Sequence, residues 1–321
     1  MTAMGVLDGK VAIVTGAGHG VGRGHALDMA AAGAKVVVND LGGSPRGEGA
    51  DEKVADVVAE LIRSRGGEAV ANHDDVSDFE GARRMVHQAI DTFGRLDVLV
   101  LNAGILRDKM IFNMDEADWD AVMKVHLKGH FAPARHACEY WRNLSKETGE
   151  PVNASVICTG SSVGLHGNVG QTNYSAAKGG IAMFAIALSA DMERYGVRAN
   201  CVAPSGNTRL ISTIPGRDAP VLEPDEYTEW NPQDPGNVAP LVVWLASDLS
   251  RHVSGQVFMT QADRIIHYHP WTRNVVLQVP GGGRKWEPEE IGPALNTFAF
   301  GSRHAGLRAG LASEGTGGRQ R

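Results

Sequence analysis

Three side chains near the middle of the chain have the types and spacing needed for proton transfer. Tyr174 and Lys178 stand four residues apart in a stretch expected to be helical, and Ser161 lies thirteen residues before the tyrosine. Residues i and i+4 share one face of a helix, so the lysine ammonium favours the ionised phenol. A free phenol titrates near pH ~10, and each unit of pKa lowering corresponds to roughly 1.4 kcal/mol. The spacing predicts a tyrosine that acts as acid or base, its pKa lowered by Lys178.

A structural interpretation competes with this one. Tyr174 and Lys178 would then be an ordinary pair on a helix surface, and Ser161 would only cap the helix that follows it. A glycine-rich turn elsewhere in the chain favours the catalytic interpretation, because it predicts a redox cofactor that the proton transfer would serve.

That turn follows the first β-branched run, as Thr15-Gly16-Ala17-Gly18-His19-Gly20-Val21-Gly22. Between a strand and a helix, such glycines let the backbone approach a pyrophosphate at the positive end of the helix. Tight turns also use glycine, but the position after an N-terminal strand favours a dinucleotide. The expected contacts are Gly16, Gly18, His19, Gly20, Val21 and Gly22.

Asp40 ends the second expected strand, twenty-four residues after Gly16. Its carboxylate can accept hydrogen bonds from ribose hydroxyls and would repel a 2′-phosphate, which favours NAD over NADP. Arg46 in the next loop would reverse this preference if it folded back, and protonated His19 would help it. Leu41, beside Asp40, is a further expected contact.

Two more strand ends are expected to meet the cofactor. Asp75 and Val76 follow the third strand; Asp75 would contact the adenine, cap a helix starting near Ser77, or do both. Asn102-Ala103-Gly104 closes the fourth strand, at the edge where an open parallel sheet binds its ligand. A simple turn from strand to helix is the alternative for these three residues.

The elements that position these residues alternate between short β-branched runs and longer helical stretches, which indicates repeated βαβ units. The pattern predicts a doubly wound α/β fold, a seven-stranded parallel sheet with helices on both faces, as one domain over residues 1–260. Residues 261–321 form an extension with a short helix from Pro288 to Thr297, and Ser205 to Asp234 is long enough for a lid. The expected strands are Val11–Thr15, Lys35–Asn39, Glu68–Asn72, Asp97–Leu101, Ala154–Thr159, Arg198–Val202 and Gln256–Met259.

Composition excludes several functional classes. The 321 residues are 43% hydrophobic and 21% charged with a formal charge of −6, so no basic field attracts nucleic acid. Apolar stretches are too short to cross a membrane, and Met1 to Gly9 has no signal core, so we expect a cytoplasmic protein. Cys158 and Cys201 are expected as reduced core thiols. His126 and His130 share a helix face, but without a third ligand we expect no metal.

Together, these motifs resemble the short-chain dehydrogenase/reductase family over residues 6–260. Val125-His126-Leu127-Lys128-Gly129 and Gly167-Asn168-Val169-Gly170-Gln171 resemble, more narrowly, the 3-hydroxyacyl-CoA dehydrogenase domain of peroxisomal multifunctional enzymes and bacterial relatives. The resemblance implies a Rossmann-type fold and catalysis by Ser161, Tyr174 and Lys178. It also implies that Thr208 holds the nicotinamide carboxamide.

One position departs from the family pattern. His126 stands where the family has an asparagine that supports a water in the proton relay from the lysine, although histidine occurs there in the narrower branch. The resemblance implies that His126 passes the proton onward. It further implies a homotetramer or homodimer, built through the helices around Trp119 to Trp141 and Tyr174 to Tyr195.

The function expected is NAD-dependent interconversion of a secondary alcohol and a ketone, on 3-hydroxyacyl-CoA or hydroxysteroid-like substrates. One alternative keeps the chemistry but changes the substrate to a smaller cyclic or aliphatic alcohol. Another is a catalytically silent NAD-binding regulator, suggested by His126 in place of asparagine.

Overall fold

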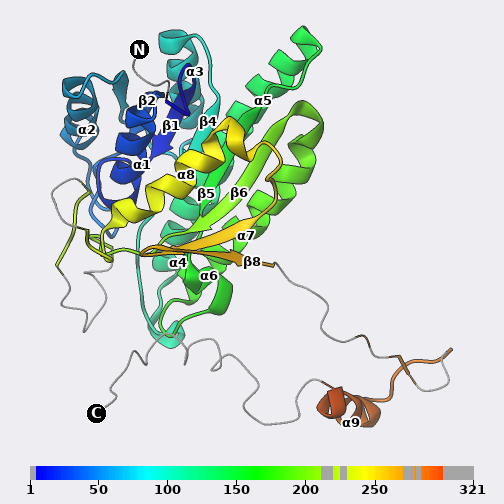
Figure 1. Cartoon of the computed structure of the whole chain (residues 1–321). Helices are drawn as coiled ribbons and strands as arrows, with labels where there is room; N and C mark the ends of the chain where they lie inside the picture. The colour runs from blue at the N-terminus through cyan, green and yellow to red at the C-terminus, as the bar shows by residue number, and fades with distance from the viewer. Residues whose placement is uncertain are drawn as a thin grey trace, which may run out of the picture. The chain divides into compact units, whose positions relative to one another are not determined.

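The apolar runs of the chain form one eight-stranded sheet in the order β3-β2-β1-β4-β5-β6-β7-β8. The computed structural model describes residues 5–210, 220–224, 230–269, 276, 278–279 and 283–298. Its strands are β1 Val11–Thr15, β2 Lys35–Asn39, β3 Ala69–Asn72, β4 Val98–Leu101, β5 Ala154–Thr159, β6 Val197–Ala203, β7 Val257–Gln261 and β8 Arg264–Tyr268. The expected α/β class is confirmed, with helices alternating with strands along the chain (Figure 1).

The last strand corrects the expected sheet. Seven strands were expected, all parallel, whereas β8 adds an eighth that runs antiparallel to β7, with Val257 opposite Tyr268. The alternation in β8 is weak because it is an edge strand with little burial: the Ile265 side chain is 62% exposed. The expected boundary after residue 260 therefore falls inside this hairpin. One compact unit extends from Met1 to Tyr268, and His269 to Arg321 form a second.

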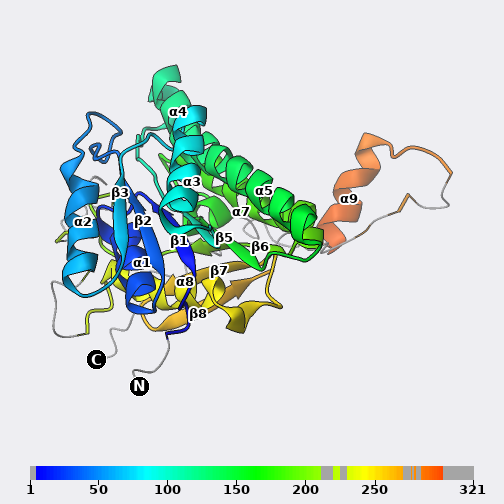
Figure 2. The same ribbon diagram turned by 90° about the horizontal axis from the view of Figure 1, so that it is seen from above.

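Helices cover both faces of the sheet (Figure 2). The helices α1 Gly20–Ala31, α2 Lys53–Ser64 and α8 Ala239–Ala246 lie on one face, and α3 Phe79–Phe93, α5 Gly129–Thr148 and α7 Thr172–Met192 lie on the other. The shorter helices are α4 Glu116–Met123, α6 Ser162–His166 and the π-helical turn η2 Lys124–Lys128. In the second unit, α9 spans Pro288–Phe298, which confirms the helix expected there.

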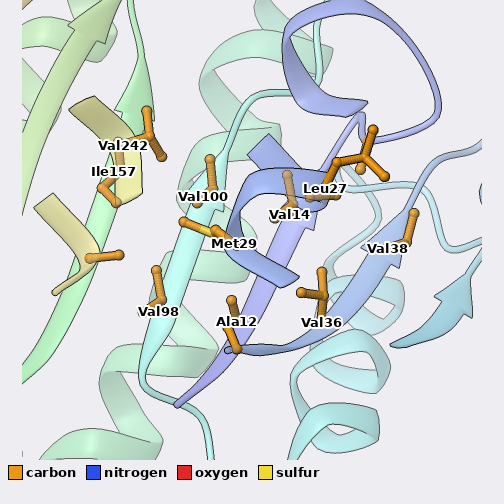
Figure 3. Close-up of a cluster of buried hydrophobic side chains, with 14 of the residues drawn as sticks. Ala12, Val14, Leu27, Met29, Val36, Val38, Val98, Val100, Ile157 and Val242 are labelled. Atoms are coloured by element: carbon orange, nitrogen blue, oxygen red, sulfur yellow. The ribbon is translucent and has the colours of Figure 1, made fainter. Parts of the chain in front are cut away.

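Successive side chains of the central strands fill two cores. Ala12, Val14, Val36 and Val38 pack beneath Leu27 and Met29 of α1 on one face (Figure 3). Ile13, Val37, Leu99 and Leu101 join the core on the opposite face, with Trp141 of α5. Each fully buried Val or Leu contributes about 1.5–3 kcal/mol, so both faces must stay covered. This double burial explains the near-continuous apolar runs.

The order of the strands indicates at which edge of the sheet a ligand would bind. β1 pairs with β2 on one side and with β4 on the other, both in parallel. The strands β1 to β3 therefore extend the sheet in one direction, and β4 and the later strands extend it in the other. An open parallel sheet holds its ligand where the strand order reverses, at the carboxyl ends of these strands. The glycine turn after β1 and Asn102 after β4 meet at this point.

Candidate active site

Close packing explains the glycines of the turn between β1 and α1. A methyl group on Gly18 would lie 2.1 Å from Val54 Cγ1, and one on Gly22 would lie 2.1 Å from the Gly16 carbonyl oxygen. Gly16 itself has a φ of +62°, a conformation that suits glycine. α1 begins at Gly20, and Val21 is buried beneath the turn. The turn thus brings bare backbone to the start of a helix, which fits a pyrophosphate.

Asn102 ties the ends of the two central strands together. Its side-chain amide donates to the carbonyl oxygens of Thr15 at 3.0 Å and Gly16 at 3.1 Å. In return, the Thr15 hydroxyl oxygen accepts from the backbone N–H groups of Asn102 at 2.8 Å and Ala103 at 3.2 Å. Asn102 therefore holds the glycine turn in place. The alternative interpretation, a simple turn after β4, does not account for these hydrogen bonds.

Asp40 projects from the end of β2 toward the glycine turn. Its carboxylate accepts from the backbone N–H of Gly18 at 2.9 Å and of Gly42 at 2.7 Å, while Leu41 is 40% exposed beside it. Of the two side chains that could favour NADP, Arg46 places its positive charge near Asp108, and the His19 ring contacts Glu223. This arrangement fits a ribose with free hydroxyls at Asp40.

The structure corrects part of the expectation for Asp75. Its Oδ1 accepts from the backbone N–H and the hydroxyl of Ser77 at 2.8 and 2.6 Å. The helix starts at Phe79, however, and Asp78 caps it by accepting from the Gly81 N–H. Asp75 shapes the preceding turn, and its pKa is lowered by the Ser77 hydrogen bonds and the Lys124 charge, against desolvation. Its neighbour Val76 is buried.

Thr208 lies against the same glycine turn. A methyl group on Gly20 would lie 3.0 Å from Thr208 Cγ2. The structure therefore brings Thr208 from the end of β6 to the expected cofactor site, and its contact with the carboxamide remains a prediction. Of the segment 205–234, which was expected to form a lid, residues 211–219 and 225–229 lie outside the described part.

The proton-transfer residues gather at the end of β5 and the start of α7. Ser161 hydrogen-bonds to the Tyr174 phenol, and it also caps α6 by accepting from the Val163 N–H at 3.2 Å. Lys178 is buried, and its ammonium donates to the Thr159 carbonyl oxygen at 2.6 Å while lying 5.6 Å from the centre of the Tyr174 ring. The capping and catalytic interpretations of Ser161 are compatible.

The structure corrects the expected pKa of Tyr174. Desolvation raises the pKa of Tyr174 to about 12, which outweighs the lowering by the Ser161 hydrogen bond, and the charge of Asp108 raises it further. Lys178, whose ammonium lies 5.6 Å from the centre of the ring, is not among the groups that lower the pKa. Burial also lowers the pKa of Lys178 to about 8.

His126 lies beside Tyr174 on a π-helical turn. The two rings meet edge to face with centroids 5.2 Å apart, and Nε2 of His126 lies 2.8 Å from the Ile105 carbonyl oxygen. Nδ1 of His130 binds the His126 carbonyl oxygen at 2.7 Å. Burial and the Lys178 charge hold the pKa of His126 well below its usual range, so the ring is neutral. The relay role of His126 remains a prediction.

Gly104 makes room for this histidine. A methyl group on Gly104 would lie 2.5 Å from His126 Cε1. Single turns of π-helix inside α-helices are frequent at functional sites. The Asn102-Ala103-Gly104 segment therefore contacts both the glycine turn and the π-helical turn that carries His126.

Two acidic residues near the site, Asp108 and Glu223, were not predicted as site residues from the sequence. Gln171 donates to Asp108 Oδ2 at 2.7 Å and accepts from Asn168 at 2.7 Å, which fixes a carboxylate close to Tyr174. Desolvation raises the pKa of Asp108. Glu223 reaches the start of α1 from the segment after β6. Asp108 follows Asn102-Ala103-Gly104 closely enough to have been considered, whereas no pattern marks Glu223.

Lys109, Arg107 and His166 each have a partner in the structure. Lys109 binds Asp118 at 2.6 Å, and Arg107 lies 3.7 Å from the same carboxylate. His166 packs against Tyr268 of β8 with ring centroids 5.5 Å apart.

Within the described ranges, no three His, Cys, Asp or Glu side chains gather as a metal site. No helix in the described part of the chain is long and apolar enough to span a membrane.

The chain is similar to known dehydrogenases over most of its length. Residues 10–211 match the family described as short chain dehydrogenase. The chain is 38% identical over 296 residues to hydroxyacyl-CoA dehydrogenase ChsB1 of Mycobacterium tuberculosis, covering 92% of this chain and 90% of that protein. It is 41% identical over 284 residues to peroxisomal multifunctional enzyme type 2 of Mus musculus, covering 88% of this chain but 36% of the mouse protein.

A solved structure has the same fold. The crystal structure of a short chain dehydrogenase from Mycobacterium avium matches with a TM-score of 0.80 and 45% sequence identity, covering 93% of this chain and 97% of that one.

Proposed function

Since the chain belongs to the short-chain dehydrogenase/reductase family, we propose that it interconverts a 3-hydroxyacyl-CoA and the 3-oxoacyl-CoA, with NAD as hydride acceptor. The observation that carries this proposal is the convergence of Ser161, Tyr174 and Lys178 at the edge of the sheet that also holds the glycine turn. Relatives named as hydroxyacyl-CoA dehydrogenase and as a multifunctional enzyme support the substrate class.

Each residue has a defined task in this reaction. The nicotinamide, when bound, supplies the hydride chemistry at its C4 carbon. Tyr174 takes the hydroxyl proton during oxidation and returns it during reduction, and Ser161 donates a hydrogen bond to the substrate oxygen as charge develops there. Lys178, 5.6 Å from the centre of the Tyr174 ring, would place positive charge beside the phenolate that forms when the proton leaves. Gly16, Gly18, Gly20 and Gly22 would bind the cofactor phosphates, and Asp40 would bind the adenosine ribose.

The activity is tested by following NADH formation with a panel of 3-hydroxyacyl-CoAs, hydroxysteroids and simple secondary alcohols. We expect the highest kcat/KM with a 3-hydroxyacyl-CoA. Faster turnover of a simple alcohol would move the substrate to that class. Measurable NADH binding without turnover of any substrate would instead support a silent regulator.

Replacing Asp40 with serine is expected to relax the preference for NAD. Removal of the carboxylate takes away the ribose acceptor and the repulsion of a 2′-phosphate, so KM for NAD should rise about tenfold and KM for NADP should fall by a similar factor. Initial rates with both cofactors measure the ratio. Asp51→Ser, in the exposed loop that follows, is the control and should leave it unchanged. An unaltered ratio for Asp40→Ser would mean that another group selects the cofactor.

We also propose that the protein assembles as a homodimer or homotetramer. Trp119 of α4, Phe131 of α5 and Met183 of α7 are 39%, 47% and 43% exposed, although all three are large apolar side chains. Burying them between copies would remove apolar area from water. Sedimentation equilibrium tests the assembly, and a monomer at micromolar concentration would contradict it.

A further inference from the structure

A carboxylate of the protein itself lies on the helix end that is expected to bind phosphate. Oε2 of Glu223 accepts from the Gly20 backbone N–H at 2.7 Å, and Oε1 lies 2.8 Å from Nδ1 of the His19 ring. Gly20 is the first residue of α1 and His19 is its N-cap, which makes no side-chain capping bond of its own. Glu223 thus supplies an anion to an end of the helix where the backbone dipole favours one.

The segment that carries Glu223 is anchored on both sides of it. The Leu222 N–H donates to the Asn207 carbonyl oxygen at 3.0 Å, and the Leu222 side chain is only 5% exposed. Pro224 is also buried and packs over α1, where a methyl group on Gly24 would lie 3.3 Å from Pro224 Cγ. The backbone at Glu223 is therefore held against the start of α1.

The surroundings of Glu223 suit an ionised carboxylate. Hydrogen bonds from His19 and Gly20 and the charges of His19 and Arg23 lower the pKa of Glu223 despite its desolvation. Near neutral pH it therefore carries its negative charge. A diphosphate seated at the same N–H group would meet this charge at short range, where like charges repel strongly.

We propose that the Glu223 carboxylate competes with the diphosphate of the dinucleotide for the N-terminus of α1, so that the cofactor binds only when this side chain turns away. The inference rests on the proposed function, because it requires that a dinucleotide uses the glycine turn. Glu223 has three rotatable side-chain bonds, so it can leave while Leu222 and Pro224 keep the backbone in place. The competition lowers the apparent affinity for the cofactor by the fraction of molecules in which the site is open.

The test compares Glu223→Gln and Glu223→Ala with the wild-type protein in calorimetric titrations with NADH, ADP and adenosine. Each variant removes the charge, and Glu223→Gln keeps the shape of the side chain. Glu60→Gln is the matched control, because Glu60 on α2 is exposed and pairs only with the neighbouring Arg63 in the described structure. Both Glu223 variants should bind NADH and ADP about tenfold more tightly than wild type. Adenosine affinity should not change, since adenosine has no phosphate.

The possible outcomes separate the two proposals. If wild type binds NADH and both Glu223 variants bind it equally or more weakly, the competition is wrong and the proposed function stands. A gain that appears equally in Glu60→Gln, or equally with adenosine, also overturns it, because net charge or adenine contacts would then explain the gain. If none of the proteins binds NADH, the proposed function fails and the inference fails with it.

Discussion

The Tyr174→Phe variant is expected to lose about a thousandfold in kcat for oxidation of the preferred 3-hydroxyacyl-CoA, while its dissociation constant for NADH stays within about twofold of wild type. The phenol is the acid–base group, so its loss removes the proton path and leaves hydride transfer from the alcohol, or to the ketone, without a proton partner. The ring itself, which packs edge to face against His126, is retained. Cofactor binding should persist because the glycine turn and Asp40 are untouched.

Steady-state kinetics and NADH titration measure the two effects separately. Tyr140→Phe is the control, because Tyr140 is a partly buried phenol on α5 that packs against the core of that face of the sheet and is not among the site residues. Its kcat should match wild type. Turnover of Tyr174→Phe at the wild-type rate would contradict the mechanism, and an equal loss in Tyr140→Phe would point to general damage.

The Lys178→Met variant is expected to lose about a hundredfold to a thousandfold in kcat and yet to unfold at a higher denaturant concentration at pH 7. Activity falls because the cation that stabilises the Tyr174 phenolate is gone. Stability rises because the fold no longer buries an ammonium, whose one hydrogen bond among the described residues goes to the Thr159 carbonyl oxygen. Methionine fills a similar volume without a charge.

The pKa of Lys178 gives the sign and the pH range of the stability effect. Its folded value of about 8 lies below the ordinary 10.5, so burial of the charged form opposes folding. That opposition is complete below pH 8, where both states are protonated, and it fades between pH 8 and 10.5. A shift of this size corresponds to roughly 3 kcal/mol, partly offset by the lost hydrogen bond.

Urea unfolding at several pH values, without added cofactor, tests this prediction. The stability gain of Lys178→Met should be largest at pH 7 and should shrink steadily from pH 8 to 10.5. Lys146→Met, an exposed position on α5, should show no such trend. A gain that stays constant with pH would mean that packing, and not the buried charge, explains it.

Local sequence was enough to place the strands and the cofactor turn. β1, β2 and β5 match their expected bounds, and the other expected strands differ by at most two residues at an end. Double burial produces β-branched runs such as Val36-Val37-Val38, which are typical of central strands. β8 was missed because an edge strand needs little burial, so Arg264 and His267 interrupt its apolar pattern without cost.

The N-cap of α3 could not be predicted from residue type alone. Asp74, Asp75 and Asp78 all precede the same helix, and each is a good cap by type. The choice of Asp78 follows from the backbone path, which the two hydrogen bonds from Ser77 to Asp75 shape. Residue type alone does not separate three carboxylates so close together.

By itself, the sequence determined the α/β class, the glycine turn, Asp40 as the candidate ribose ligand and the group of Ser161, Tyr174 and Lys178, because each depends on spacing within one or two neighbouring elements. Only the tertiary structure decided which groups act on those residues. The pKa of Tyr174 depends on desolvation and on Asp108, Lys178 donates to Thr159, and Glu223 arrives at α1 from about two hundred residues away in the chain. Desolvation and contacts between distant segments arise only when the sheet and its helices are packed together, so no local pattern records them.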